Sequence, residues 1–205
     1  MNYAIMTLEE LPACREITTR AFMNYPYFTV HFPDPKKRES YIRGVVDMDM
    51  RLNRDHSVYF TARDDDGTLA AVGQVCPPGY RDASDLKYFF GGYWKFIFTQ
   101  NIGAMLSWLS MREKAGEPCH AISDMWYANL LTVDPPYQGK GVGSGMMRDC
   151  FIPYIKAQGG KGMTLFTNTE YNREYYRRKG FKEFDERFFE YKGGRVGSWS
   201  FRMDF

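Results

Sequence analysis

A glycine-rich segment, residues 138–144, follows an apolar stretch and a proline turn and leads into a helical pattern. Backbone N–H groups at the start of a helix have no partner within the helix and carry partial positive charge. Glycines allow a bulky anion to approach such a backbone closely. The residue types and their order therefore predict a binding site for a phosphate or pyrophosphate group.

The spacing of this loop excludes the two best-known nucleotide-binding loops. A P-loop requires Ser or Thr directly after Gly-Lys, whereas Lys140 is followed by Gly141. The dinucleotide fingerprint requires a third glycine, and Ser144 or Met146 stands at that position in the two available registers. For the loop taken alone, a glycine-rich turn that binds nothing remains an alternative.

Two blocks of the sequence resemble the GNAT (GCN5-related N-acetyltransferase) superfamily. The loop fits the family's pyrophosphate pattern Q-x-x-G-x-G, and a later block fits N-x-x-x-Y-x-x-x-G-F without gaps. The specific resemblance covers about residues 125–181 and implies an acyl-CoA-dependent N-acetyltransferase that uses acetyl-CoA as co-substrate and no metal. The matching residues are Gln138, Gly141, Gly143, Asn172, Tyr176, Gly180 and Phe181, and Trp126-Tyr127 resembles the start of the preceding strand in one branch.

The resemblance also implies where coenzyme A binds. In this fold the strand before the loop diverges from the strand after the next helix, and the pantetheine arm lies between them. Backbone groups of Leu131 and Val133 are expected to pair with that arm, and the amides of the loop to hold the pyrophosphate. The expected coenzyme A-binding residues are Leu131, Thr132, Val133, Gln138, Gly139, Lys140, Gly141, Val142, Gly143, Ser144, Thr169 and Asn172.

The reaction that the resemblance implies is direct attack of an amine on the thioester. Tyr176 stands at the family's general-acid position and can protonate the departing thiolate; the alternative is a core tyrosine on an amphipathic helix. Some relatives carry a carboxylate base on the strand before the loop, but this chain has Tyr127 and Asn129 on that face. Proton removal by a single base and removal through waters both stay open.

The acceptor side is expected near residues 25–33, a proline-bounded aromatic loop. These side chains either wall the amine pocket or pack in the core. The acceptor is expected to be a small-molecule primary amine of unidentified structure. A non-catalytic acyl-CoA-binding regulatory module on the same fold is the alternative function. The candidate acceptor-binding residues are Tyr25, Phe28, His31, Phe32 and Tyr127.

The elements that must position these residues alternate in type along the chain. An antiparallel hairpin combined with β-α-β units predicts an α/β fold with a mixed central sheet and helices on both faces, formed by residues 1–205 as one domain. The expected strands are 3–6, 57–63, 68–75, 125–133, 162–168, 181–190 and 198–204. The expected helices are 8–24, 35–55, 85–114 with a break at Gly91-Gly92, 143–158 and 170–179.

The composition of the chain disfavours several classes of binding partner. The formal net charge is only +2 and no basic block occurs, which disfavours nucleic acid as a partner. The four cysteines form no C-x-x-C pair, which disfavours zinc and indicates a reduced, cytoplasmic protein, with Cys14 and Cys150 at core positions. Neither a signal peptide nor a long apolar run is recognisable, so no membrane partner is expected. A monomer or a homodimer fits these features.

Overall fold

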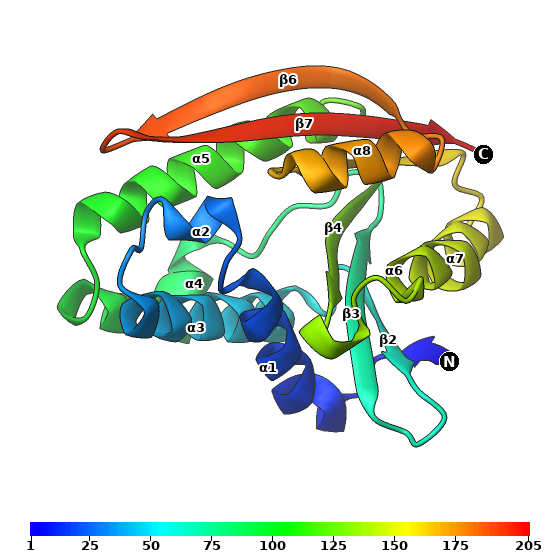
Figure 1. Cartoon of the computed structure of the whole chain (residues 1–205), viewed down its shortest axis with the longest axis horizontal. Coiled ribbons are helices and arrows are strands. Elements are labelled where there is room, and N and C mark those ends of the chain that lie inside the picture. The colour runs from blue at the N-terminus through cyan, green and yellow to red at the C-terminus, as the bar shows by residue number, and fades with distance from the viewer.

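A seven-stranded sheet runs through the computed structural model, which describes residues 1–205, in the order β1-β2-β3-β4-β5-β7-β6 (Figure 1). Every neighbouring pair is antiparallel except β4 and β5, which are parallel. The predicted mixed sheet is therefore confirmed. The strands are β1 (Asn2–Ile5), β2 (Val58–Arg63), β3 (Leu69–Cys76), β4 (Trp126–Val133), β5 (Gly162–Thr167), β6 (Lys182–Tyr191) and β7 (Gly194–Asp204).

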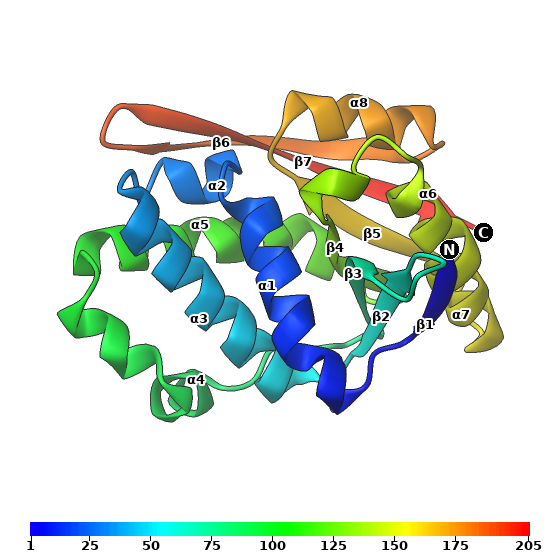
Figure 2. The same ribbon diagram turned by 60° about the horizontal axis from the view of Figure 1, so that its bottom comes forward.

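Helices cover both faces of the sheet, as expected. One face carries α1 (Leu11–Phe22), α2 (Pro26–Thr29), α3 (Pro35–Asn53) and α5 (Ile102–His120), with α4 (Asp85–Gly91) packed on α3. The other face carries α6 (Val142–Met146), α7 (Ile152–Ala157) and α8 (Glu170–Arg178). Figures 1 and 2 show the two groups on opposite sides of the central strands. None of the helices is both long and apolar enough to cross a membrane.

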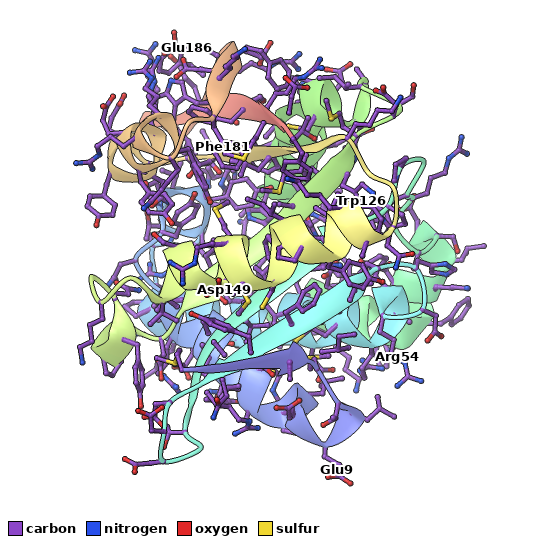
Figure 3. The ribbon with its side chains drawn as sticks, turned by 90° about the vertical axis from the view of Figure 1, so that its right-hand side faces the viewer. Glu9, Arg54, Trp126, Asp149, Phe181 and Glu186 are labelled. Carbon is purple, nitrogen blue, oxygen red and sulfur yellow. The ribbon has the colours of Figure 1, made fainter.

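Each face has its own hydrophobic core. The core under α1, α3 and α5 is rich in aromatic side chains and includes Tyr41 and Trp108. The core under α6, α7 and α8 includes Phe151 and Phe201, both fully buried. In Figure 3 the α6–α7 helix, with Asp149 on it, crosses in front of the sheet. All four cysteines are buried and unpaired, which confirms the core positions of Cys14 and Cys150.

The α6–α7 helix is continuous but irregular. A π-helical turn, Met147–Phe151, separates its two α-helical parts. Pro153 lies two residues after this turn, and proline removes one N–H donor from the helical ladder. The π-turn contains one extra residue, which shifts the hydrogen-bond register of the helix near the place where Pro153 cannot donate a regular hydrogen bond.

The region from 85 to 120 differs most from the expected elements. The break at Gly91-Gly92 is present, and Gly92 has a φ of 130°. A second break precedes Asn101. The Asn101 side chain caps α5 by accepting a hydrogen bond from Ala104 N (2.9 Å). The helix then continues six residues beyond the expected end at residue 114, through Pro118. Burial of this last turn against β5 and β7 holds it in place despite the poor helix propensity of proline.

Two further boundaries were wrong in detail. The segment 25–33 is not only a loop, because α2 forms within it. Strand β7 begins at Gly194, earlier than the expected residue 198, because β6 and β7 form one long hairpin. Its turn places Lys192 and Gly193 at φ values of 47° and 82°, where the chain reverses and pairing restarts at once.

Candidate active site

Strands β4 and β5 pair only briefly and then separate. Their register contains two pairs, Trp126 with Met163 and Tyr127 with Thr164. Directly afterwards a bulge at Asn129 interrupts the pairing of β4 with β3. The C-terminal half of β4 therefore keeps β3 on one side and has no paired strand on the other, and a V-shaped opening results.

The backbone of β4 faces this opening at alternate residues. Asp134 N donates to Ala70 O of β3 (2.8 Å), and strand alternation then turns the N–H and C=O groups of Leu131 and Val133 away from β3. The Val133 carbonyl accepts a hydrogen bond from Gln138 Nε2 (3.0 Å), which agrees with this orientation. Thr132 points elsewhere, because its hydroxyl lies 3.2 Å from the Thr18 hydroxyl on α1 and donates to Val72 O.

The glycine-rich loop lies between the end of β4 and the start of α6. Gly139 and Gly141 have φ values of 74° and 82°, in the left-handed region that favours glycine. A Cβ at either position would meet no heavy atom within 4 Å, so the space in front of the loop is open. The first helical bond runs from Gly145 N to Gly141 O (2.9 Å), which leaves the preceding N–H groups without partners inside the helix.

Helix α8 closes the other side of the opening and is tied to the loop. The Tyr175 and Ser144 hydroxyls lie 3.0 Å apart. Thr169 caps α8, since its hydroxyl accepts a hydrogen bond from Asn172 N (3.1 Å). The ring of Tyr176 packs against Phe181 and Phe201. Burial raises the pKa of Tyr176, so the phenol keeps its proton at neutral pH.

A cavity of about 1350 Å³ extends from this opening to the helices on the opposite face. It brings together three of the expected acceptor-side residues, Tyr25, Phe28 and Tyr127, with Asn172 and Tyr176 from α8. Tyr25 is anchored at the end of β5, because its hydroxyl accepts from Asn168 N (2.9 Å) and lies 3.1 Å from the Thr167 hydroxyl. The expected acid position and three expected acceptor positions therefore border one cavity.

Two expected acceptor-side residues, His31 and Phe32, lie outside this lining. His31 stacks on Tyr191 of the β6–β7 hairpin, and its Nε2 is 3.1 Å from the Ser107 hydroxyl. Phe32 packs on Tyr41 of α3, with ring centroids 4.1 Å apart. Helix α2 turns the chain, so that Phe28 lines the cavity while the residues after it pack behind the wall. We therefore remove His31 and Phe32 from the acceptor side.

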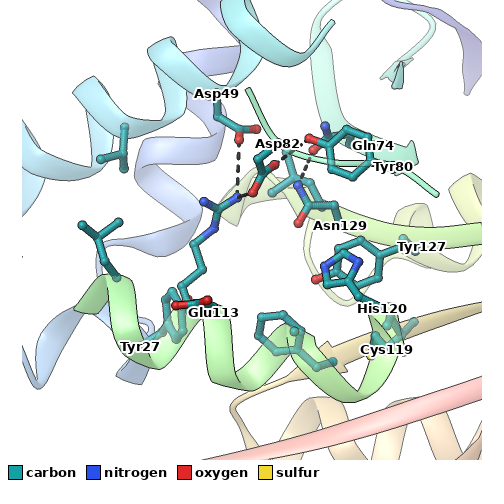
Figure 4. Close-up of a pocket in the computed structure, with 18 of the residues that line it drawn as sticks. Tyr27, Asp49, Gln74, Tyr80, Asp82, Glu113, Cys119, His120, Tyr127 and Asn129 are labelled. Carbon is teal, nitrogen blue, oxygen red and sulfur yellow. Dashed lines mark hydrogen bonds and ion pairs between the residues drawn. The ribbon is translucent and has the colours of Figure 1, made fainter. Parts of the chain in front are cut away.

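Sequence reasoning missed several polar residues of the cavity. His120, the last residue of α5, lines it with its ring centroid 4.4 Å from that of Tyr127. Burial lowers the pKa of His120, which favours the neutral imidazole at pH 7. At the other end, Asp49 and Asp82 approach the guanidinium of Arg112 (Figure 4). No spacing pattern marks these residues, because they come from separate elements that only the fold brings together.

Comparisons with known proteins agree with this geometry. Residues 96–183 match the family model of the acetyltransferase (GNAT) domain. No curated protein sequence matches the chain significantly. Among solved structures, the polyamine N-acetyltransferase of Drosophila melanogaster, which catalyses the formation of N-acetylagmatine, has a TM-score of 0.65 at 15% identity, with 100% of both chains covered.

Two further structures come from bacteria. A protein of Corynebacterium glutamicum described as histone acetyltransferase HPA2 and related acetyltransferase has a TM-score of 0.65 at 16% identity, covering 97% of this chain and 94% of that one. The ribosomal-protein-S18-alanine N-acetyltransferase of Escherichia coli has a TM-score of 0.55 at 14% identity, covering 99% and 92%. At these identities the likeness shows the fold. The family match covers residues 96–183, so this part of the chain is identified as a GNAT acetyltransferase domain, and the fold of the whole chain is that of the GNAT acetyltransferases.

Proposed function

We propose that the protein is an N-acetyltransferase that takes the acetyl group from acetyl-CoA and transfers it to the primary amine of a small molecule. The observation that carries this proposal is the opening between β4 and β5, which has the glycine-rich loop at its mouth and the cavity behind it. The Drosophila neighbour acts on a small amine and the Escherichia coli neighbour on a ribosomal protein. The cavity of about 1350 Å³ behind the opening has room for a small molecule and favours that class of acceptor here.

In this proposal the backbone of β4 binds the pantetheine arm as a neighbouring strand would, through Leu131 and Val133. The amides of residues 138–144 hold the pyrophosphate at the start of α6. Thr169 and Asn172 border the arm from the side of α8. The Ser144–Tyr175 contact fixes the loop to α8, so that both walls of the opening keep their spacing.

The chemical step is attack of the neutral amine nitrogen on the thioester carbon, followed by cleavage of the carbon–sulfur bond. Backbone N–H groups of β4 stabilise the charge that develops on the carbonyl oxygen. Tyr176 hydrogen-bonds the departing sulfur. Because burial raises the pKa of Tyr176 further above that of an alkyl thiol, about 8.5, this phenol stabilises the thiolate by hydrogen bonding, and the thiolate takes its proton from solvent as it is released.

The amine proton leaves toward the acceptor end of the cavity. We assign its acceptance to His120, directly or through one water, because the imidazole is neutral and lies beside Tyr127, the last residue of β4 that pairs with β5. Cys119 also lines the cavity, but burial raises the pKa of its thiol to about 12. A thiol in this state is a poor nucleophile, which favours direct transfer over an acyl-cysteine intermediate.

The test is amine-dependent release of free coenzyme A thiol from acetyl-CoA, with the acetylated product identified by mass. A panel of primary amines should include at least one that supports turnover. Tight acetyl-CoA binding with no amine-dependent release across small amines and peptide N-termini would instead indicate a non-catalytic acyl-CoA-binding module.

A further inference from the structure

The end of the cavity away from the β4–β5 opening carries excess negative charge. Asp49 of α3 and Asp82 of the segment after β3 share one guanidinium, that of Arg112 on α5, at 3.6 and 3.0 Å. All three residues line the cavity, and Figure 4 shows Asp49 and Asp82 approaching one guanidinium there. Two carboxylates facing one guanidinium leave a net negative charge, which is shielded from solvent at Asp49 and more open to it at Asp82, whose side chain is 39% exposed.

Asp49 is held rigidly in this position. Its carboxylate accepts hydrogen bonds from the Tyr59 hydroxyl (2.9 Å), the Tyr88 hydroxyl (3.0 Å) and Asn53 Nδ2 (2.9 Å). Burial raises the pKa of Asp49, while the nearby Arg112 opposes that rise. A positive group entering the cavity would oppose it further, so the charged form of Asp49 and a bound cation stabilise each other.

An unpartnered hydroxyl points to a ligand at the same place. The Tyr27 side chain is only 7% exposed, and its hydroxyl has no hydrogen-bond partner. Tyr27 lines the cavity, and the charges of Arg112 and Asp82 both act on its phenol. A buried hydroxyl without a partner is destabilising, and an N–H group of a bound molecule can satisfy it by donating to the phenol oxygen.

The fold sets the separation between this cluster and the site of acetyl transfer. Tyr59, Gln74 and Leu130 are neighbours across β2, β3 and β4, and adjacent strands lie about 4.8 Å apart. The backbone of β2 at Tyr59 is therefore roughly 10 Å, or two strand spacings, from β4, and Asp49 lies at the far end of the Tyr59 side chain, bonded to its hydroxyl. The apolar side chains of Met50 and Trp108 line the cavity along with these groups.

We propose that the acceptor is a dication, in which a short aliphatic chain joins the reacting amine to a second cationic group, an ammonium or a guanidinium. The second cation binds beside Asp49 and Asp82, which already hold Arg112 between them, and donates a hydrogen bond to Tyr27, while the reacting amine reaches the β4–β5 opening. This inference rests on the proposed function in one respect only, namely that the amine at the β4–β5 opening is the group that is acetylated.

The test compares two ligands of equal chain length that differ by one charge. Binding of 1,5-diaminopentane and of pentylamine to the coenzyme A-saturated protein is measured by calorimetry, which needs no turnover. We expect the diamine to bind the wild type at least about tenfold more tightly. Asp49→Asn and Asp82→Asn should each reduce this preference to less than about threefold, and Tyr27→Phe should reduce it partly.

Controls separate charge recognition from misfolding. Asp65→Asn makes the same change in the exposed β2–β3 turn and should keep the full preference. Asp82 lies in a loop, so its variant stays informative if Asp49→Asn fails to fold. Equal affinities of the wild type for the two ligands, or an unchanged preference in the folded variants, would overturn the inference.

The outcome also distinguishes this inference from the proposed function. Preferential diamine binding that depends on Asp49 and Asp82, without formation of acetylated product, supports the inference and contradicts acetyl transfer. Acetylation of both ligands with equal affinities supports acetyl transfer and contradicts the inference.

Discussion

The two sides of the site are built by different means. The proposed coenzyme side is a short stretch of backbone, from β4 through the glycine-rich loop into α6. The proposed acceptor side collects side chains from α1, α2, α3, α5 and the segment after β3. A ligand that is the same for every relative can be bound by main-chain groups at fixed spacing. A ligand particular to one protein is bound by side chains that different elements supply. The comparison predicts that a single substitution in the backbone-built coenzyme side has a large effect on ligand binding, whereas single substitutions on the acceptor side have smaller effects that differ in size.

The largest effect is expected from Gly141→Asp. This substitution places a carboxylate where the loop amides face the pyrophosphate, so acetyl-CoA affinity should fall by at least about a hundredfold. At one hundred times its dissociation constant, acetyl-CoA should stabilise the wild type by about 2.7 kcal/mol. Thermal unfolding with and without acetyl-CoA should show that shift in the wild type and none in the variant.

Gly67→Asp is the matched control for backbone strain. Gly67 lies in the β2–β3 turn with a φ of 81°, and a Cβ there also meets nothing within 4 Å, as at Gly141. Both variants should lose similar stability without ligand, yet only Gly67→Asp should retain the acetyl-CoA shift. Equal shifts in the two variants would contradict the assignment of the loop to the pyrophosphate.

A smaller but still large effect is expected from Tyr176→Phe. The ring and its packing on Phe181 and Phe201 remain, so folding and acetyl-CoA affinity should change little. Loss of the hydroxyl should slow the chemical step by about ten- to a thousandfold. A single-turnover measurement is needed, because product release can mask the chemical step.

The control is Tyr171→Phe, since Tyr171 lies on the same helix and is 73% exposed. It should keep the wild-type single-turnover rate. A Tyr176→Phe variant that also keeps that rate would make Tyr176 a packing residue and leave the thiolate to be stabilised by water.

His120→Gln should have a moderate, pH-dependent effect. Burial lowers the pKa of His120, so the wild-type imidazole stays neutral above its ordinary value of about 6.5 and gains a proton only when the pH falls below that value. We expect the ratio of wild-type to variant kcat/KM to be about tenfold and constant above pH 7, and to shrink as the pH falls through the lowered pKa. The ratio cancels the titration of the amine itself; a ratio independent of pH would contradict the role of His120.

The smallest effect is expected from a pair of matched core substitutions, Phe28→Leu and Phe32→Leu. Both side chains are almost fully buried, so each variant should lose about 1 kcal/mol of stability. Only Phe28 lines the cavity, so only its variant should change the relative kcat/KM of bulky and slender amines, by roughly fivefold. A change of similar size in Phe32→Leu would show that the wall of the acceptor pocket was assigned incorrectly.

The elements around the proposed coenzyme site could be predicted from the sequence because their signals are local. Prolines mark the end of β4, and glycines mark the loop that follows it. The four-residue spacing of Asn172, Tyr176 and Gly180 indicates a helix that ends at a glycine. Each of these features is decided within a few residues, and the structure places them around one opening. The mixed sheet could also be predicted, because an antiparallel hairpin precedes the β-α-β units.

The acceptor side could not be predicted in the same way. The assignment of His31 rested on its place in an aromatic segment, but α2 turns that histidine behind the wall, whereas His120 lies on a helix that was expected to end at residue 114. Asp49, Asp82 and Arg112 lie far apart along the chain and meet only through tertiary packing. The spacing of residues along the sequence does not indicate such contacts.

The most direct test of the central claim is a crystal structure of the protein with coenzyme A. We expect the pantetheine arm between β4 and β5, paired with the backbone of Leu131 and Val133, the pyrophosphate on the amides of residues 138–144, and the sulfur within hydrogen-bond reach of the Tyr176 hydroxyl. Coenzyme A bound at another surface, or an empty opening in crystals soaked at millimolar concentration, would contradict the account.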